Sequence, residues 1–213
     1  MAAASKGTCQ VCKGVFPKNQ MTRHLAKCAA GPAPDEPWLH VVVEGMISPD
    51  YWLHVRAGSR ATLAHLDAFL RDIWLECCGH LSEFRINETS YLSEKVDDPY
   101  ARRMNAAIGR ILGPGDSFTY LYDFGSSTEL RLRAVAERQG PPVKDRIVLL
   151  ARNEPPSIAC DQCGAPATLV CSECSWSGAG FVCDACGRSH ECGEEMLLPL
   201  VNSPRAGVCA YTG

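Results

Sequence analysis

The spacing of apolar residues predicts a β-rich central region. In residues 38–44, Leu39, Val41 and Val43 share one face of an extended strand. Residues 45–50 contain Gly, Ser and Pro and predict a turn, after which residues 51–56 predict the returning strand. Further strands are predicted at 84–86, 118–124, 129–136 and 146–151, with a hairpin turn at 125–127.

Two helices are predicted among these strands. Between residues 62 and 78 the apolar side chains fall on one helical stripe, with Thr62 as the N-cap and Gly79 as the stop; the stripe comprises Leu63, Leu66, Leu70, Ile73 and Cys77. Residues 100–112 predict a second helix that ends at Gly113. This order of elements predicts an α+β fold, in which a central mixed or antiparallel sheet with two helices is flanked by small zinc-binding modules.

Composition divides the chain into five segments. The three prolines of residues 31–37 predict a semi-rigid linker. We therefore expect a zinc finger at 1–30, an α+β domain at 38–152, a cysteine-rich module at 158–195 and a C-terminal tail at 196–213 that packs on the core.

Thirteen cysteines in 213 residues need a chemical explanation. Disulfides would require an oxidising compartment, yet no apolar signal-peptide core precedes Cys9. No stretch approaches the ~18–20 apolar residues of a membrane helix. We therefore expect a cytoplasmic, reducing setting without membrane association, in which Cys-x-x-Cys pairs serve as metal ligands.

The N-terminal segment has the spacing of a zinc finger. Its ligand set is Cys9, Cys12, His24 and Cys28, in which the last two lie four residues apart and so share one helix face. The segment resembles the finger with two cysteines and two histidines, with Cys28 in place of the last histidine and one residue fewer in the loop. This pattern predicts one structural Zn²⁺.

The C-terminal module carries eight further ligands, which predict two more Zn²⁺ ions and three in total. The ligands are Cys160, Cys163, Cys171, Cys174, Cys183, Cys186, His190 and Cys192. A cross-brace and a sequential pairing are both compatible with the spacing. The segment from Phe181 to His190 resembles B-box and ZZ-type modules, which usually mediate protein contacts. Because every ligand is committed, these sites are expected to be structural rather than catalytic.

Charge restricts nucleic-acid binding to the finger. The formal net charge is −3, whereas a general polyanion binder would be basic. Residues 1–31 carry five basic groups and no acidic ones. The candidate phosphate contacts are therefore Lys13, Lys18, Arg23 and Lys27, although packing of the finger on its own domain or on another protein is an equal alternative.

Several residues of the central region allow more than one interpretation. Cys77, Cys78 and His80, with Cys209, can form a further metal site, but Cys77 continues the apolar stripe, so we favour an ordinary buried role. Asp123 is expected to bind the amides of Ser126 or Ser127 in a turn. His40 and His54 are expected at the surface of adjacent strands.

Three stretches of the central region resemble a known family. They are Tyr51-Trp-Leu-His, Gly79-His-Leu-Ser-Glu-Phe-Arg-Ile86 and Phe118-Thr-Tyr-Leu-Tyr-Asp-Phe-Gly125. Together they resemble the Ri-plasmid ORF-3-like family, also labelled as TnpR-type passenger proteins of insertion elements. The tail from Leu198 resembles the ending of a zinc-finger-bearing branch. The resemblance implies an α+β domain and an association with mobile elements, without a defined mechanism.

These observations favour a zinc-binding protein without enzymatic activity that acts as an adaptor for a protein partner. One alternative is a nucleic-acid-associated protein that uses the basic finger. Another is an enzyme with a site around His80, Glu83 and Asp123 in the central domain, although no phosphate loop or catalytic triad pattern supports it.

Overall fold

The computed structural model describes residues 5–29, 36–94 and 99–213. The chain divides into two compact units. The first comprises Met1–Leu70 and Leu81–Glu154, and the second comprises Arg71–His80 and Pro155–Gly213. Of the predicted linker, residues 31–35 lie outside the described residues, and residues 36–37 begin a strand of the first unit.

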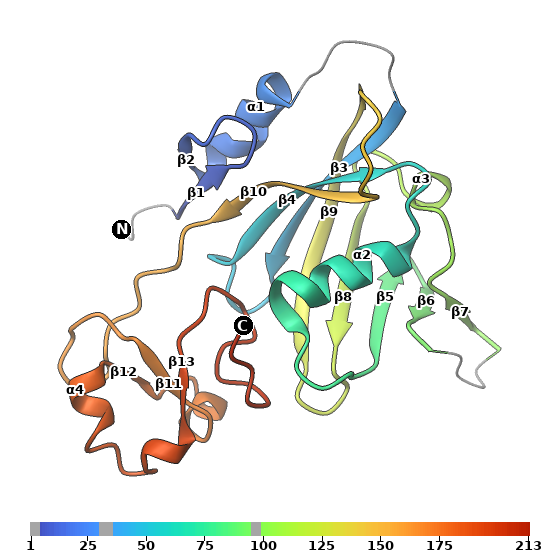
Figure 1. Ribbon diagram of the computed structural model, residues 1–213. Helices are drawn as coiled ribbons and strands as arrows, with labels where there is room; N and C mark the ends of the chain where they lie inside the picture. The colour runs from blue at the N-terminus through green and yellow to red at the C-terminus, as the bar shows by residue number, and fades with distance from the viewer. Residues whose placement is uncertain (1–4, 30–35, 95–98) are drawn as a thin grey trace. The chain divides into compact units, whose positions relative to one another are not determined.

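Within the described residues, the first unit is built on one ten-stranded sheet with the order β2-β1-β10-β4-β3-β9-β8-β5-β6-β7 (Figure 1). Neighbouring strands are antiparallel except β6 and β7, so the predicted α+β fold with a mixed sheet is confirmed. The strands are β1 (Lys6–Cys9), β2 (Val15–Pro17), β3 (Glu36–Gly45), β4 (Trp52–Gly58), β5 (Ser82–Ile86), β6 (Thr89–Leu92), β7 (Ala101–Arg103), β8 (Ser117–Tyr122), β9 (Thr128–Gly140) and β10 (Ile147–Asn153).

The predicted helix at 62–78 forms only in its first half. Helix α2 (Leu63–Leu70) buries its apolar stripe, and a π-helical turn, η1 (Arg71–Leu75), replaces the rest. The predicted stop at Gly79 is wrong, because the helical turns already end at Leu75; the φ of 76° at Gly79 belongs to a later turn. Thr62 occupies the predicted N-cap position, one residue before α2, and its carbonyl accepts from the Leu66 N–H at 3.3 Å. Its N–H and hydroxyl both meet His65 Nδ1, at 3.1 and 2.7 Å.

The predicted helix at 100–112 is wrong. Residues 101–103 form β7, and only α3 (Ile108–Ile111) is helical. The N–H groups of Leu63 and Ala64, at the start of α2, bond instead to the carbonyls of Ala106 and Met104 at 3.1 and 2.8 Å. The first N–H groups of a helix have no partner inside it, so the chain before α3 satisfies them in an extended form.

The finger segment is continuous with the sheet. Strand β1 pairs with β10 from Gly7 opposite Asn153 to Cys9 opposite Ala151. Helix α1 (Lys18–Cys28) buries Met21 and Leu25 in one apolar cluster, whose other buried members are Cys9, Trp38, Trp52, Leu150 and Ala151. The finger thus shares its core with the strands on which it lies.

The second unit contains a three-stranded sheet with the order β12-β11-β13. Its elements are β11 (Leu169–Cys171), η2 (Cys174–Ser177), β12 (Phe181–Val182), α4 (Asp184–Gly187), η3 (Glu194–Met196) and β13 (Leu197–Pro199). These elements are short, and five of the eight predicted ligands lie outside them, namely Cys160, Cys163, Cys183, His190 and Cys192. Among the helices of the described residues, none is long and apolar enough to cross a membrane.

Candidate metal centres

The finger cluster is assembled by the β1–β2 hairpin and α1. Cys9 ends β1, Cys12 lies in the turn that follows, and His24 and Cys28 lie one turn apart on α1. The two sulfurs of Cys9 and Cys28 are 3.9 Å apart, and Cys12 Sγ lies 3.4 Å from His24 Nε2. Phe16 stacks on the imidazole with 3.7 Å between ring centroids, which holds that ring in place.

The eight ligands of the C-terminal module form two groups in a cross-brace. Cys160, Cys163, Cys183 and Cys186 form one group, and Cys171, Cys174, His190 and Cys192 form the other. The first and third Cys-x-x-Cys pairs therefore converge, while the second pair meets His190 and Cys192. Of the two pairings left open by the spacing, the structure contains the interleaved one.

The distances within these groups fit a tetrahedral zinc ion. With Zn–S of about 2.3 Å and Zn–N of about 2.0–2.1 Å, the tetrahedral edges are about 3.8 Å for S···S and about 3.6 Å for S···N. The sulfurs of Cys163 and Cys183 are 3.7 Å apart, and Cys174 Sγ lies 3.6 Å from both Cys192 Sγ and His190 Nε2. In each group the four ligand atoms lie within 4.8 Å of one another, so the groups are compatible with bound Zn²⁺.

The thiols within one group differ in acidity. Burial raises the pKa of Cys160, but the backbone N–H groups of Cys183, Cys163 and Gln162 outweigh it and lower the pKa to about 6. In the same group, the hydrogen-bonded neighbours Cys163 and Cys183 raise the pKa of Cys186 to about 12. Four thiols this close therefore ionise together only when a cation offsets their repulsion, which a bound Zn²⁺ does.

The described residues contain four groups that can hold a metal ion, one more than the three sites predicted from the sequence. Cys77, Cys78, His80 and Cys209 also place their ligand atoms within 4.8 Å of one another. The apolar-stripe interpretation of Cys77 fails because the regular helix ends at Leu70, before that residue is reached. All thirteen cysteines now belong to a group of four ligands, and all are free thiols.

The basic side chains of the finger do not all face solvent. Lys18 forms an ion pair with Glu44 at 3.1 Å and bonds to the carbonyl of Pro49. Lys13, Arg23 and Lys27 are exposed. The N-terminal end of α1 therefore faces the sheet of its own unit, and only part of the predicted phosphate-contacting set is accessible.

The residues proposed for a central catalytic site have structural partners. Asp123 is buried with a φ of 68°, and its Oδ1 accepts a hydrogen bond from the Gly125 N–H at 2.9 Å. This donor lies one residue before Ser126, whose N–H is a predicted donor. Glu83 accepts hydrogen bonds from Ser90 and Arg85. Asp123 is not among the ligands of the Cys77 group.

The expectation that His40 and His54 lie at the surface is wrong. Both are buried, and His40 Nε2 lies 2.8 Å from His54 Nδ1. Burial, followed by the charges of Arg138 and Arg133, lowers the pKa of His40 to about 4. Burial, followed by His40, lowers the pKa of His54 to about 3. The pair is therefore neutral near pH 7 and shares one proton across its hydrogen bond.

A buried carboxylate was missed by the sequence analysis. Asp67 Oδ1, on α2, accepts hydrogen bonds from Ser82 Oγ at 2.6 Å and from Tyr120 Oη at 2.7 Å. These bonds tie α2 to β5 and β8. The sequence around Asp67 shows only an acidic residue beside the apolar face of a predicted helix. It does not indicate that hydroxyl groups of β5 and β8 will donate hydrogen bonds to this carboxylate.

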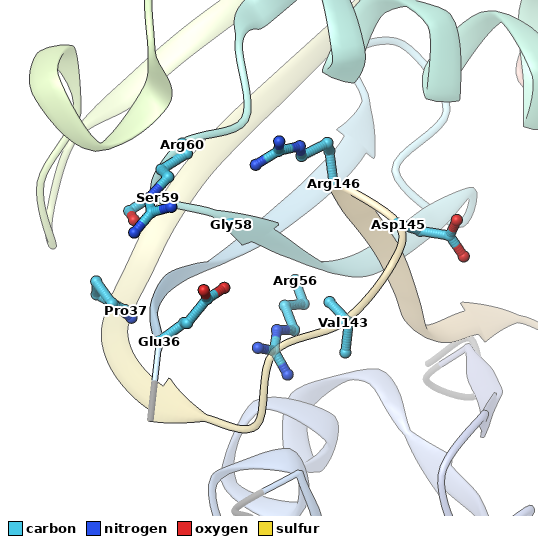
Figure 2. Close-up of a pocket in the computed structure, with 9 residues that line it drawn as sticks. All are labelled: Glu36, Pro37, Arg56, Gly58, Ser59, Arg60, Val143, Asp145 and Arg146. Carbon is cyan, nitrogen blue, oxygen red and sulfur yellow. The ribbon is translucent and has the colours of Figure 1, made fainter. Parts of the chain in front are cut away.

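Two pockets of the first unit differ in size. The pocket in Figure 2 has a volume of about 80 Å³, well below the ~300–1,000 Å³ of small-molecule sites. Its Arg56 is held over the Trp38 ring at 5.2 Å and donates to the Pro141 carbonyl at 2.6 Å. A second pocket of about 410 Å³ lies between α1 and the sheet, and His54 and Arg133 contribute to its wall.

Comparison with known proteins leaves the family open. No protein-family model matches the chain, and no curated protein matches it. A crystal structure of a protein of unknown function from Methanosarcina mazei Go1 superposes with a TM-score of 0.49 and 17% sequence identity, covering 61% of this chain and 75% of that chain. At this level of similarity the match supports neither a family nor a function.

Proposed function

We propose that the protein is a zinc-binding adaptor, in which Zn²⁺ ions hold small modules in shape so that they can contact another protein. The observation that carries this proposal is that the finger group and the two groups of the C-terminal module are each closed. Four protein ligand atoms lie within 4.8 Å of one another, which completes a tetrahedron and leaves no position for water or substrate. A closed zinc site stabilises structure and does not activate a nucleophile.

An exposed aromatic side chain on the C-terminal module supports a protein partner. Trp176 is 66% exposed and lies on η2, which begins at the ligand Cys174. Tryptophan is enriched at the energetically important positions of protein interfaces. The zinc ligands next to it would hold this side chain on a rigid turn, which lowers the entropy lost on binding.

Photo-crosslinking in cells tests this proposal. A photoreactive phenylalanine analogue replaces Trp176 in one variant and Tyr100, which is 87% exposed in the first unit, in a control variant. We expect a protein adduct that is specific to position 176 and is lost when Cys174→Ser disrupts the adjacent group. Equal adducts at both positions, or none at 176, would overturn the assignment of this surface.

A nucleic-acid role of the finger is the alternative, and it is compatible with the resemblance to passenger proteins of insertion elements. The exposure of Arg23 and Lys27 favours it. If the finger binds nucleic acid, Arg23→Gln and Lys27→Gln weaken a salt-dependent electrophoretic mobility shift. Lys18→Gln changes that shift much less, because the Lys18 ammonium already pairs with Glu44. A shift that is unaffected by all three substitutions would exclude the finger as the contact.

A further inference from the structure

The fourth group of cysteines and histidine is built from two chain segments of the second unit. Cys77, Cys78 and His80 follow η1, and Cys209 lies near the C-terminal end of the described chain. Cys78 and Cys209 are 131 positions apart in sequence. The group therefore joins the short segment Arg71–His80 to the tail of the unit.

The ligand atoms of this group approximate the edges of a tetrahedron. Cys78 Sγ lies 3.5 Å from Cys77 Sγ and 3.6 Å from Cys209 Sγ, while His80 Nε2 lies 3.4 Å from Cys209 Sγ. These values are close to the edges of about 3.8 and about 3.6 Å that zinc requires. The Cys78 Sγ to His80 Nε2 distance of 2.9 Å is the short edge, and a bound ion would widen it.

The backbone conformation of both segments directs the four ligand side chains toward one position. Gly79 has a φ of 76°, and its N–H donates to Glu76 Oε1 at 2.6 Å, which closes the turn between the cysteines and His80. Glu76 is itself paired with Arg71 at 2.8 Å. Cys209 has a φ of 51°, a left-handed conformation that costs a residue with a Cβ free energy and occurs mostly where other contacts maintain it.

A buried cation balances the charge of the group. Arg205 is fully buried, and its guanidinium donates to Cys77 Sγ at 3.4 Å. Three thiolates and one Zn²⁺ carry a net charge of −1, which a guanidinium neutralises. Burying a charge is unfavourable unless a partner of opposite charge is present, and a metal-bound thiolate at Cys77 would supply such a partner to Arg205.

The tail is positioned for this contact by a second anchor. Ser203 Oγ donates to the Trp74 carbonyl of η1 at 2.6 Å and accepts from the Arg205 N–H at 2.9 Å. Ser203 is buried. The same short stretch of tail thus contacts the π-helical turn through a hydrogen bond and reaches the cysteine pair through Cys209.

We propose that Cys77, Cys78, His80 and Cys209 form a fourth structural Zn²⁺ site, which fastens the C-terminal tail to the segment that follows α2. The site is closed by four protein ligands, so it has no open position for catalysis. Its role is a cross-link between two segments that are distant in sequence, and it is distinct from the three sites on which the proposed adaptor function depends.

Native mass spectrometry of the full-length protein, purified without a chelator, tests this proposal together with differential alkylation of cysteines. We expect four zinc ions per chain, and we expect Cys77, Cys78 and Cys209 to resist alkylation until a chelator is added. Three zinc ions together with rapid alkylation of these three thiols would overturn the proposal. A Cys77–Cys78 or Cys78–Cys209 disulfide in freshly isolated, unreduced protein would overturn it as well.

Variants locate the fourth ion. Cys209→Ser is expected to retain three zinc ions and to expose Cys77 and Cys78 to alkylation, while the ten cysteines of the other groups stay protected. Thr212→Ser, an exposed change in the same tail, is the matched control and should retain all four ions. Four ions in Cys209→Ser would refute the assignment of Cys209. Loss of the crosslink at position 176 with four zinc ions still bound would refute the adaptor proposal alone.

Discussion

Gly7 provides a sharp test of whether the finger rests on the sheet. It lies in β1 opposite Asn153 of β10. A Cβ at this position would lie 2.3 Å from Trp52 Cη2 and 2.4 Å from the carbonyl oxygen of Arg152. Neither atom can move freely, because Trp52 is fully buried with its Nε1 bonded to Ser5 Oγ at 2.9 Å, and the carbonyl belongs to the β10 backbone. Gly7→Ala must therefore displace β1 from its neighbour.

The size of the effect follows from two opposing contributions. Overpacking of a closely packed site costs about 1–3 kcal/mol, whereas replacing glycine reduces the entropy of the unfolded chain and stabilises by about 0.4–1 kcal/mol. We expect Gly7→Ala to lower the free energy of unfolding by about 1–2 kcal/mol on these figures. Gly58→Ala is the control, since its Cβ would meet only the Arg146 carbonyl at 3.5 Å, an ordinary contact. That variant should gain up to about 1 kcal/mol.

Urea unfolding of the zinc-loaded protein, followed by tryptophan fluorescence, measures both variants against the wild type. Native mass spectrometry on the same samples checks that the finger still holds its ion. Opposite shifts of the midpoint with unchanged slope are the expected result. If Gly7→Ala is as stable as Gly58→Ala, then β1 does not lie on β10 in solution, and the finger is an independent unit.

Three further predictions concern metal, pH and the buried carboxylate. Chelation should unfold the second unit while the first keeps most of its amide protection in hydrogen exchange, because only the first has a large apolar core. The free energy of unfolding should fall as pH drops from 6.5 toward the pKa values of His40 and His54, about 4 and about 3, because the unfolded chain then binds more protons than the folded chain. The slope is up to about 1.4 kcal/mol per pH unit for each imidazole. Urea unfolding should show a smaller slope in a His40→Gln/His54→Asn variant. Asp67→Ala removes the carboxylate that accepts from two buried hydroxyls and should cost about 1–3 kcal/mol for each bond lost, whereas Tyr120→Phe should cost about 1 kcal/mol in the same assay.

Local periodicity predicts an element well when the element buries one face. Strand β9 alternates buried and exposed side chains over Thr128–Ala134, and the pattern is visible in the sequence for that reason. The helix prediction for residues 100–112 failed because the conformation of this segment depends on hydrogen bonds to residues outside it. The carbonyls of Met104 and Ala106 accept hydrogen bonds from the N–H groups at the start of α2. A helix-propensity scale evaluates one segment at a time, so it contains no information on hydrogen bonds to a distant helix.

The ligands of the metal groups were predictable to different degrees. A Cys-x-x-Cys knuckle is a local structure, so its spacing identifies the ligands, but the path of the chain between knuckles decides which pairs share an ion. The cross-brace could therefore be named only as one of two options. The Cys77 group lacks even that signal, because its fourth ligand, Cys209, lies 131 positions beyond Cys78. From the sequence alone, Cys77 and Cys78 are explained as ordinary buried thiols. Only the structure places Cys209 of the tail beside them.

The distribution of apolar residues explains why the metal groups are unevenly divided between the units. Among the described residues of the second unit, the buried apolar side chains other than cysteine are Trp74, Leu75, Val170, Val182 and Tyr211. A core of that size cannot offset the entropy of ordering such a segment, and small domains of this kind depend on metal ions or disulfides. Three of the four groups lie in this unit. The finger shares a tryptophan-rich core with the sheet, so an ion bound there would add to a stability that packing already provides. Zinc binding should therefore be a condition of folding in the second unit and an increment in the first.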